Sequence, residues 1–154
     1  DDDKTFDMMT DDQIESAGVI SVMSNIVPDA VQRMTRALDG GDQAEAERLR
    51  DGLSPLFGMV GVASEEETPF GKTTVKARNP LPVKTLMNVL GMPAGPCRKP
   101  LGKMNEAGFD TVVNNALQVQ DKLPEAFAPI ETFFGVDVAG RLADLSGSRG
   151  SLVY

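Results

Sequence analysis

The sequence predicts a mostly α-helical chain with five or six helices and one or two strands. Three observations lead to this fold class. Apolar residues recur at helical spacing in most segments between residues 27 and 145. Proline and glycine residues stand where those segments begin and end. Only residues 18–23, with the sequence GVISVM, have the nearly continuous β-branched and apolar character of a strand buried on both faces.

The first forty residues predict short helical turns, the strand and one longer helix. Residues 5–17 carry a few apolar side chains at helical spacing and precede the strand at 18–23. Pro28 suits the first helical position, because its missing N–H would have no partner there. Gly40 and the glycine after it predict the end of that helix.

The middle of the chain predicts a second long helix and then an irregular segment. Asp42 followed by Glu45 is typical of a helix start, and Arg48 lies three residues after Glu45, which favours an ion pair. We expect residues 58–79 to form a solvated surface loop, with a short edge strand near 73–76 as the alternative. The remaining helices are expected at 80–90, 105–122, 126–134 and 138–145, with a Pro/Gly-rich loop at 91–103 and a flexible tail at 146–154.

One buried strand in an otherwise helical chain is physically awkward. Its backbone N–H and C=O groups need partners on both edges. Two solutions remain open at this point. Either a second strand lies within residues 60–77, or another chain supplies the rest of the sheet.

Composition excludes several classes of function. The 154 residues contain no histidine and one cysteine, which excludes Ser-His and Cys-His nucleophile pairs, histidine or cysteine-rich metal sites, and an internal disulfide. A net charge of −8 with scattered basic residues argues against nucleic-acid binding. No apolar run is long enough to span a membrane, and no signal-peptide pattern opens the chain. A reducing, cytoplasmic setting is expected.

Three features could carry chemistry, and each has an ordinary explanation that we favour. Cys97 precedes two cations that would lower a thiol pKa, but with no base it is expected to pack as a small apolar residue. Lys84 is expected to bring its amine to the surface rather than serve as a buried nucleophile. The acidic run 65–67 lacks the spacing of a cation-binding loop. We expect no metal and no cofactor, and these features alone predict no specific activity.

Three sequence stretches nevertheless resemble one family. They are GVISVMSN at 18–25, RNPLPVK at 78–84 followed by a Leu-Gly pair at 90–91, and RKPLG at 98–102. In this order they resemble the C-terminal half of dihydrodipicolinate synthases, within the Schiff-base-forming (β/α)8-barrel lyases related to N-acetylneuraminate lyase. The acidic start DDDK is typical either of a protease-tag remnant or of the edge of a longer chain, and Asp1 and Asp2 are similar to the family's segment after barrel strand seven.

The resemblance implies a division of the chain. Residues 1–40 would form the end of the barrel, with strand eight at about 18–24 and its helix. Residues 41–145 would form the C-terminal helical extension, and residues 146–154 the flexible tail. The fold class would then be the last strand or strands of a barrel together with its helical extension. The lone strand would pair with neighbours in a missing N-terminal half.

The resemblance also implies an activity for the complete enzyme. The family condenses pyruvate, held as a Schiff base on a lysine of strand six, with aspartate semialdehyde, in lysine and diaminopimelate biosynthesis. That lysine, the proton-relaying tyrosine and the substrate-binding arginine have no counterpart in this chain, so we expect the chain alone to be inactive. One residue of the family's active-site region has a counterpart in this chain. Ile20 matches an isoleucine whose backbone carbonyl lies near the reactive lysine.

The expected partner is the missing barrel half or another copy of the chain, so an oligomer is expected. The alternative function is a non-catalytic helical module that binds a partner or associates with itself through the unpaired strand. A barrel rebuilt from two copies is a third possibility that the strand count does not favour.

Overall fold

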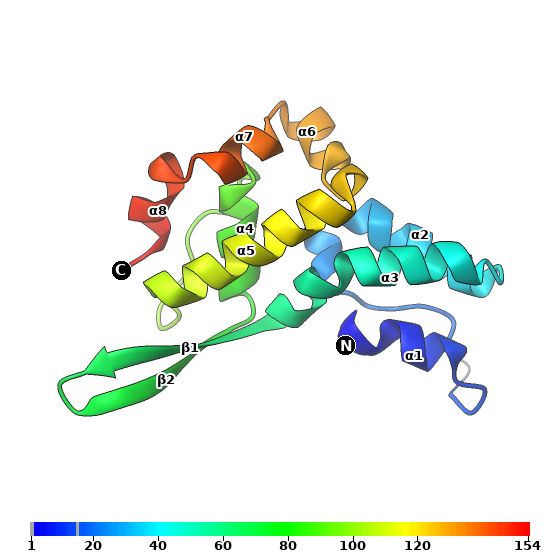
Figure 1. The fold of residues 1–154 in the computed structure, drawn as a ribbon, viewed down its shortest axis with the longest axis horizontal. Coiled ribbons are helices and arrows are strands. Elements are labelled where there is room, and N and C mark those ends of the chain that lie inside the picture. The colour runs from blue at the N-terminus through cyan, green and yellow to red at the C-terminus, as the bar shows by residue number, and fades with distance from the viewer. Residues whose placement is uncertain (1, 15) are drawn as a thin grey trace.

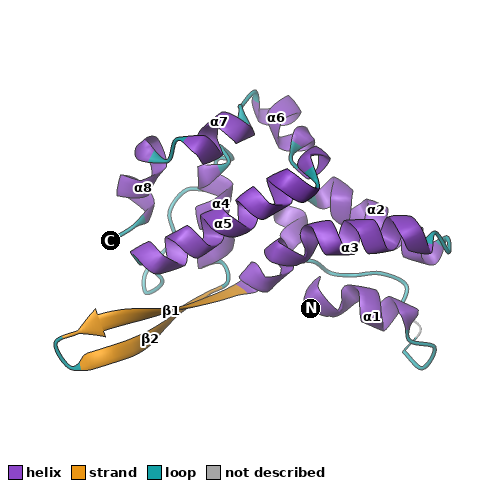
Figure 2. Ribbon diagram, in the orientation of Figure 1, coloured by secondary structure: helices purple, strands orange, loops and turns teal. Residues whose placement is uncertain are grey.

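Helices dominate the described part of the chain, as the spacing of apolar residues predicts (Figures 1 and 2). The computed structural model describes residues 2–14 and 16–154. Its helices are α1 (Thr5–Thr10), α2 (Pro28–Asp39), α3 (Gln43–Phe57), α4 (Leu81–Val89), α5 (Glu106–Lys122), α6 (Ala128–Phe134), α7 (Val138–Ala143) and α8 (Ser146–Leu152). Strands β1 (Gly61–Thr68) and β2 (Gly71–Arg78) form the one sheet within this range.

The helix boundaries follow local chemistry. Pro28 is the first residue of α2, and the helix ends at Gly40, whose N–H donates to the carbonyl of Arg36 at 2.9 Å. Asp42 caps α3, because its carboxylate accepts a hydrogen bond from the N–H of Glu45 at 3.2 Å. The predicted capping residue is therefore confirmed.

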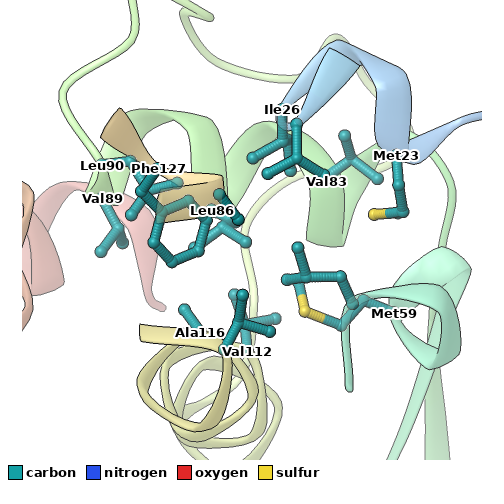
Figure 3. Packing of buried hydrophobic residues seen from close by; sticks show 14 of the residues in the cluster. Met23, Ile26, Met59, Val83, Leu86, Val89, Leu90, Val112, Ala116 and Phe127 are labelled. Carbon is teal, nitrogen blue, oxygen red and sulfur yellow. The ribbon is translucent and has the colours of Figure 1, made fainter. Parts of the chain in front are cut away.

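The core lies where α5 crosses α3 and α4 (Figures 1 and 3). Phe109, Val112 and Ala116 of α5 are completely buried and face the other helices. Leu86 of α4 and Phe127, between α5 and α6, complete this part of the cluster. Burial of so many aliphatic and aromatic side chains is the main stabilising contribution to the fold.

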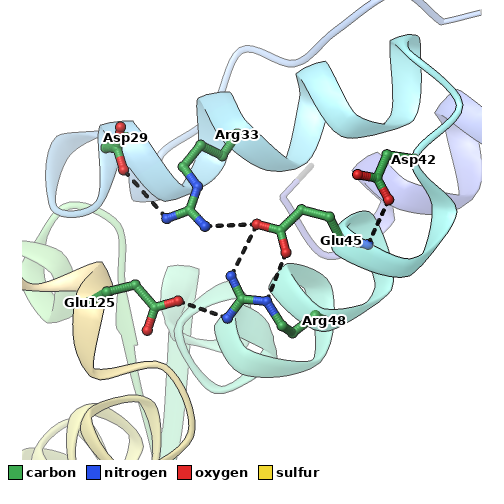
Figure 4. A network of polar contacts seen from close by, with 6 residues as sticks. All are labelled: Asp29, Arg33, Asp42, Glu45, Arg48 and Glu125. Carbon is green, nitrogen blue, oxygen red and sulfur yellow. Dashed lines mark hydrogen bonds and ion pairs between the residues drawn. The ribbon is translucent and has the colours of Figure 1, made fainter.

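An ion-pair network joins α2, α3 and the short 3-10 turn Pro124–Ala126 (Figure 4). Glu45 is at its centre and accepts from Arg33 at 2.7 Å and from Arg48 at 2.8 Å. Arg48 also contacts Glu125 at 2.7 Å, and Arg33 lies 3.8 Å from Asp29. Hydrogen bonds from Arg48, and next from Arg33, lower the pKa of Glu45 from its usual 4.5 to about 2.

Glu45→Gln is expected to destabilise the chain at neutral pH, with an effect that vanishes in acid. The pKa of Glu45 is lower in the folded chain than in the unfolded chain. The ionised carboxylate therefore contributes fully to the free energy of unfolding above about pH 4.5, and this contribution is lost as the pH falls through about 2. The urea midpoints of the two proteins should therefore differ at neutral pH and converge towards pH 2. Glu66→Gln, on exposed β1, removes the same charge without breaking an ion pair and is the control. A pH-independent difference for Glu45→Gln would contradict the network's role.

The prediction of a surface loop at residues 58–79 is wrong. Its residues form an antiparallel hairpin in which Gly61 pairs with Arg78, and the alternative strand near 73–76 falls within β2. Figure 2 shows this hairpin projecting from the helical body. Most of its side chains are exposed, and the three glutamates and the lysine and threonine residues give neither strand a clear apolar alternation. Val62 is buried, and with its half-buried partner Ala77 it anchors the base of the hairpin to the core.

Two further expectations need correction. Residues 18–22 form no strand within the described chain, and Met23–Asn25 form a 3-10 turn instead. A strand requires a neighbouring strand, and no described segment supplies one there. The expected flexible tail at 146–154 contains helix α8, and the N–H of Tyr154 donates to the carbonyl of Met104 at 3.1 Å. The last residues are therefore tied to the loop that precedes α5.

Candidate functional site

The segment at residues 18–22 has neither helix nor strand structure and lies between α1 and α2 in the chain. Among the described residues, the backbone groups of residues 18–20 make no hydrogen bond to another backbone group. The Ile20 side chain is 101% exposed, although Met23, three residues later, is completely buried. Single exposed apolar residues are common, and Phe70 and Phe133 are exposed as well. At Ile20 the exposed side chain coincides with backbone groups that have no backbone partner in the described chain, and this combination is a feature of a strand that lacks its neighbours.

The carboxylate of Asp2 holds this segment in place. It accepts a hydrogen bond from the hydroxyl of Ser21 and another from the N–H of Val22 at 3.0 Å. The residue is only 4% exposed, so these two contacts satisfy a buried polar group. They join the first described residues to the segment at 18–22. The family resemblance is the sole sequence signal for Asp2, and composition gives no sign of this contact.

Two shallow hollows flank the Ile20 side chain. One, of about 390 Å³, lies towards α4, where Val83 and Met87 form part of its wall. The other, of about 330 Å³, lies towards Asp2 and the end of α3 at Phe57. Ile20 lines both of them. The segment is therefore a ridge with an open surface on each side.

Of the other sequence candidates, Lys84 lines the hollow on the α4 side of Ile20, and the others lie elsewhere. Lys84 donates to the carbonyl of Pro96 at 2.9 Å through an exposed amine, which confirms the expected surface position. Cys97 is half-buried, packs against the core as expected, and lines the same pocket as Lys84. The acidic run 65–67 lies on exposed β1, far along the projecting hairpin (Figure 1).

Neither a metal centre nor a membrane span is found in the described residues. Within residues 2–14 and 16–154, no three His, Cys, Asp or Glu side chains are grouped so as to hold a metal ion. Of the described helices, none combines the length and apolar character needed to cross a bilayer. The ridge at Ile20 thus remains the candidate site.

Comparison with known proteins gives a consistent result. The model of the dihydrodipicolinate synthetase family matches residues 2–119 of this chain. The 4-hydroxy-tetrahydrodipicolinate synthase of Methanococcoides burtonii is 36% identical over 101 residues, which is 66% of this chain and 30% of that protein. The synthase of Methanothrix thermoacetophila is 36% identical over 106 residues, which is 69% of this chain and 30% of that protein. The chain thus spans about 30% of the length of these relatives.

Solved structures give the same match. A crystal structure of dihydrodipicolinate synthase is 31% identical, with a TM-score of 0.59 over 80% of this chain and 36% of that one. The 4-hydroxy-tetrahydrodipicolinate synthase of Methylacidiphilum fumariolicum SolV is 25% identical, with a TM-score of 0.63 over 82% of this chain and 36% of that one.

Proposed function

The chain belongs to the dihydrodipicolinate synthetase family, and we propose that it is the C-terminal portion of a lyase of this family. In the complete enzyme, where neighbouring strands are present, residues from about 18 to 24 would pair as the eighth strand of a (β/α)8 barrel, and residues up to about 40 would form its last helix. Residues 41–145 provide the helical extension beyond the barrel. Asp1, which the resemblance places beside strand seven, lies outside the described residues.

The observation that carries this proposal is the unpaired ridge at Ile20. Backbone groups without ladder partners and a fully exposed isoleucine are what an eighth strand leaves when its neighbours are absent. Family members are matched over only about 30% of their length, which supports a missing remainder. The partner of this surface is therefore the N-terminal part of the barrel, or failing that a second copy of the chain.

The proposed reaction of the complete enzyme is the condensation of pyruvate with aspartate semialdehyde through a lysine Schiff base. Active sites of these barrels are built from the ends of several strands, so a single strand cannot supply one. In the complete enzyme, Ile20 acts through its backbone carbonyl, which lies near the reactive lysine. The chain alone supplies no Schiff-base lysine and does not catalyse the reaction.

A chimera tests this function. Residues 2–119, the span that the family model matches, replace the corresponding segment of the Methanococcoides burtonii synthase, which is 36% identical to this chain over 101 residues. We expect the chimera to condense pyruvate with aspartate semialdehyde, whereas the same synthase truncated before that segment is inactive. A folded but inactive chimera would contradict the proposal.

The substitution Ile20→Asp sharpens this test. In the isolated chain Ile20 is fully exposed, so the change should alter the free energy of unfolding by no more than about 0.5 kcal/mol. In the chimera the same position is buried between strands, so an unpaired carboxylate should abolish activity. Phe70→Asp, at a hairpin tip that is 99% exposed, is the matched control and should be neutral in both proteins.

A further inference from the structure

A second pocket, which shares only Lys84 with the hollow beside Ile20, lies between α4, the loop at 91–103, α7 and α8. Figure 1 shows α8 beside α4, with this loop arching between them. The pocket has a volume of about 520 Å³. Small-molecule sites in proteins fall between about 300 and 1,000 Å³, so the pocket has the size of a metabolite site.

The charge of this pocket is opposite to that of the chain. Lys84, Lys99, Lys103 and Arg141 line it, and no aspartate or glutamate among the described residues does. The whole chain has 23 acidic and 15 basic residues, so it is negatively charged overall. A wall with four cations and no carboxylate makes this pocket positively charged instead. An adjoining hollow shares Lys84 and Lys99, adds Arg98, and also has no described acidic residue in its wall. Cations gathered in a concave surface attract anions more strongly than the same cations spread over a convex one.

Neutral groups hold three of these cations in place. Lys84 donates to the carbonyl of Pro96 at 2.9 Å, and Arg141 donates through Nε to that of Val89 at 2.8 Å. Lys103 donates to two carbonyls in or just beyond α8, at 3.2 and 3.3 Å. Within the described residues, no carboxylate lies within ion-pair distance of any of the three. The side chains are therefore positioned while their charges stay uncompensated.

We propose that this pocket binds a small organic anion carrying two or more negative charges. Lysine and arginine are the usual partners of phosphate and carboxylate groups. Leu81 and Leu152 provide apolar wall between the cations, which suits the carbon skeleton of an organic molecule. The shared chemistry is a polyanion that bears phosphate groups, carboxylates or both. Anion binding in this pocket does not depend on Ile20 or on a Schiff-base lysine, so the anion site and the proposed lyase function can be refuted separately.

Calorimetric titration of the 154-residue chain tests the proposal with pyrophosphate, citrate and inorganic phosphate as probes. Pyrophosphate and citrate should bind saturably, with one molecule per chain, and inorganic phosphate more weakly because it contacts fewer cations at once. Binding should weaken as KCl is added. A preference for pyrophosphate identifies a phosphate-bearing ligand, and a preference for citrate identifies a polycarboxylate. Since the chain carries a net charge of −8, diffuse attraction cannot produce saturable binding.

Two variants locate the binding. Lys99 makes no hydrogen bond or ion pair with any described residue, so Lys99→Gln removes a charge without breaking a structural contact, and should weaken binding by about fivefold. Ser151→Asp places a carboxylate in the exposed wall of the pocket, and it should weaken anion binding at least as much as Lys99→Gln does. Lys72→Gln, on the projecting hairpin, makes the same charge change outside the pocket and should leave binding unchanged. Equal weakening by Lys72→Gln and Lys99→Gln, or no saturable binding of any probe, would overturn the proposal.

Discussion

Phe109→Ala is expected to lower the free energy of unfolding by about 3–5 kcal/mol. Phe109 is completely buried in the first turns of α5, the helix that contacts both α3 and α4. Removing its ring deletes the transfer free energy of a large apolar group and leaves a cavity that these helices cannot fill by small shifts. The guanidinium of Arg149 also lies 4.8 Å from the ring centroid and would lose that contact. Urea denaturation monitored by far-UV circular dichroism measures the effect.

Phe133→Ala is the matched control for this core substitution. Its side chain, at the end of α6, is 81% exposed, so the same chemical change should alter the free energy of unfolding by no more than about 0.5 kcal/mol. Similar losses for the two variants would show that α5 is not the centre of the core. Because domains are stable by only about 5–15 kcal/mol, the Phe109 variant should also unfold at much lower urea concentration.

Gly91→Ala is expected to cost about 2–4 kcal/mol, for two separate reasons. Gly91 ends the α4 region with φ of +92°, a conformation that strains any residue with a Cβ. A Cβ there would also lie 2.9 Å from Cγ1 of Val136 and 3.0 Å from Nε of Arg141. Displacing Arg141 would break its hydrogen bonds to the carbonyls of Val89, at 2.8 Å, and Asn88, at 3.0 Å.

Gly41→Ala separates the two reasons. Gly41 has φ of +77°, and no described atom lies within 4 Å of the position that an added Cβ would take, so only the backbone strain of about 1 kcal/mol applies. The excess cost of Gly91→Ala over Gly41→Ala therefore measures the packing of α7 against the end of α4. Equal costs in chemical denaturation would mean that Arg141 does not hold these helices together.

Local sequence signals predict the long helices. The apolar spacing in α2, α3 and α5, the proline at position 28 and the Asp42 cap are all signals within one or two turns of the chain. Such signals need no knowledge of distant residues. This is why the helical fold class and several boundaries follow from the sequence.

The full hairpin and α8 are not predicted because the contacts that stabilise them join segments that are distant in sequence or leave no apolar pattern. The hairpin carries three consecutive glutamates, and its strands are held by pairing with each other rather than by an apolar face. Helix α8 contains two glycines and three serines, which disfavour a helix locally. The loop before α5 holds its end through Met104, about fifty residues away in the chain.

The candidate site is only partly predictable for the same reason. Ile20 is identified through a family resemblance, and its full exposure is visible only in the folded chain. The buried contact from Asp2 to Ser21 spans nineteen residues and has no local signature. The four cations of the second pocket come from three separate regions of the sequence, at positions 84, 99–103 and 141.

The most direct measurement of the central claim is covalent trapping of pyruvate. Borohydride reduces a lysine–pyruvate Schiff base to a stable adduct that intact-mass spectrometry detects. The chain alone should show no added mass after treatment with pyruvate and borohydride, whereas the chimera with the Methanococcoides burtonii synthase should gain one pyruvate-derived adduct. An adduct on Lys84 or any other lysine of the isolated chain would contradict the claim that the catalytic lysine lies outside it.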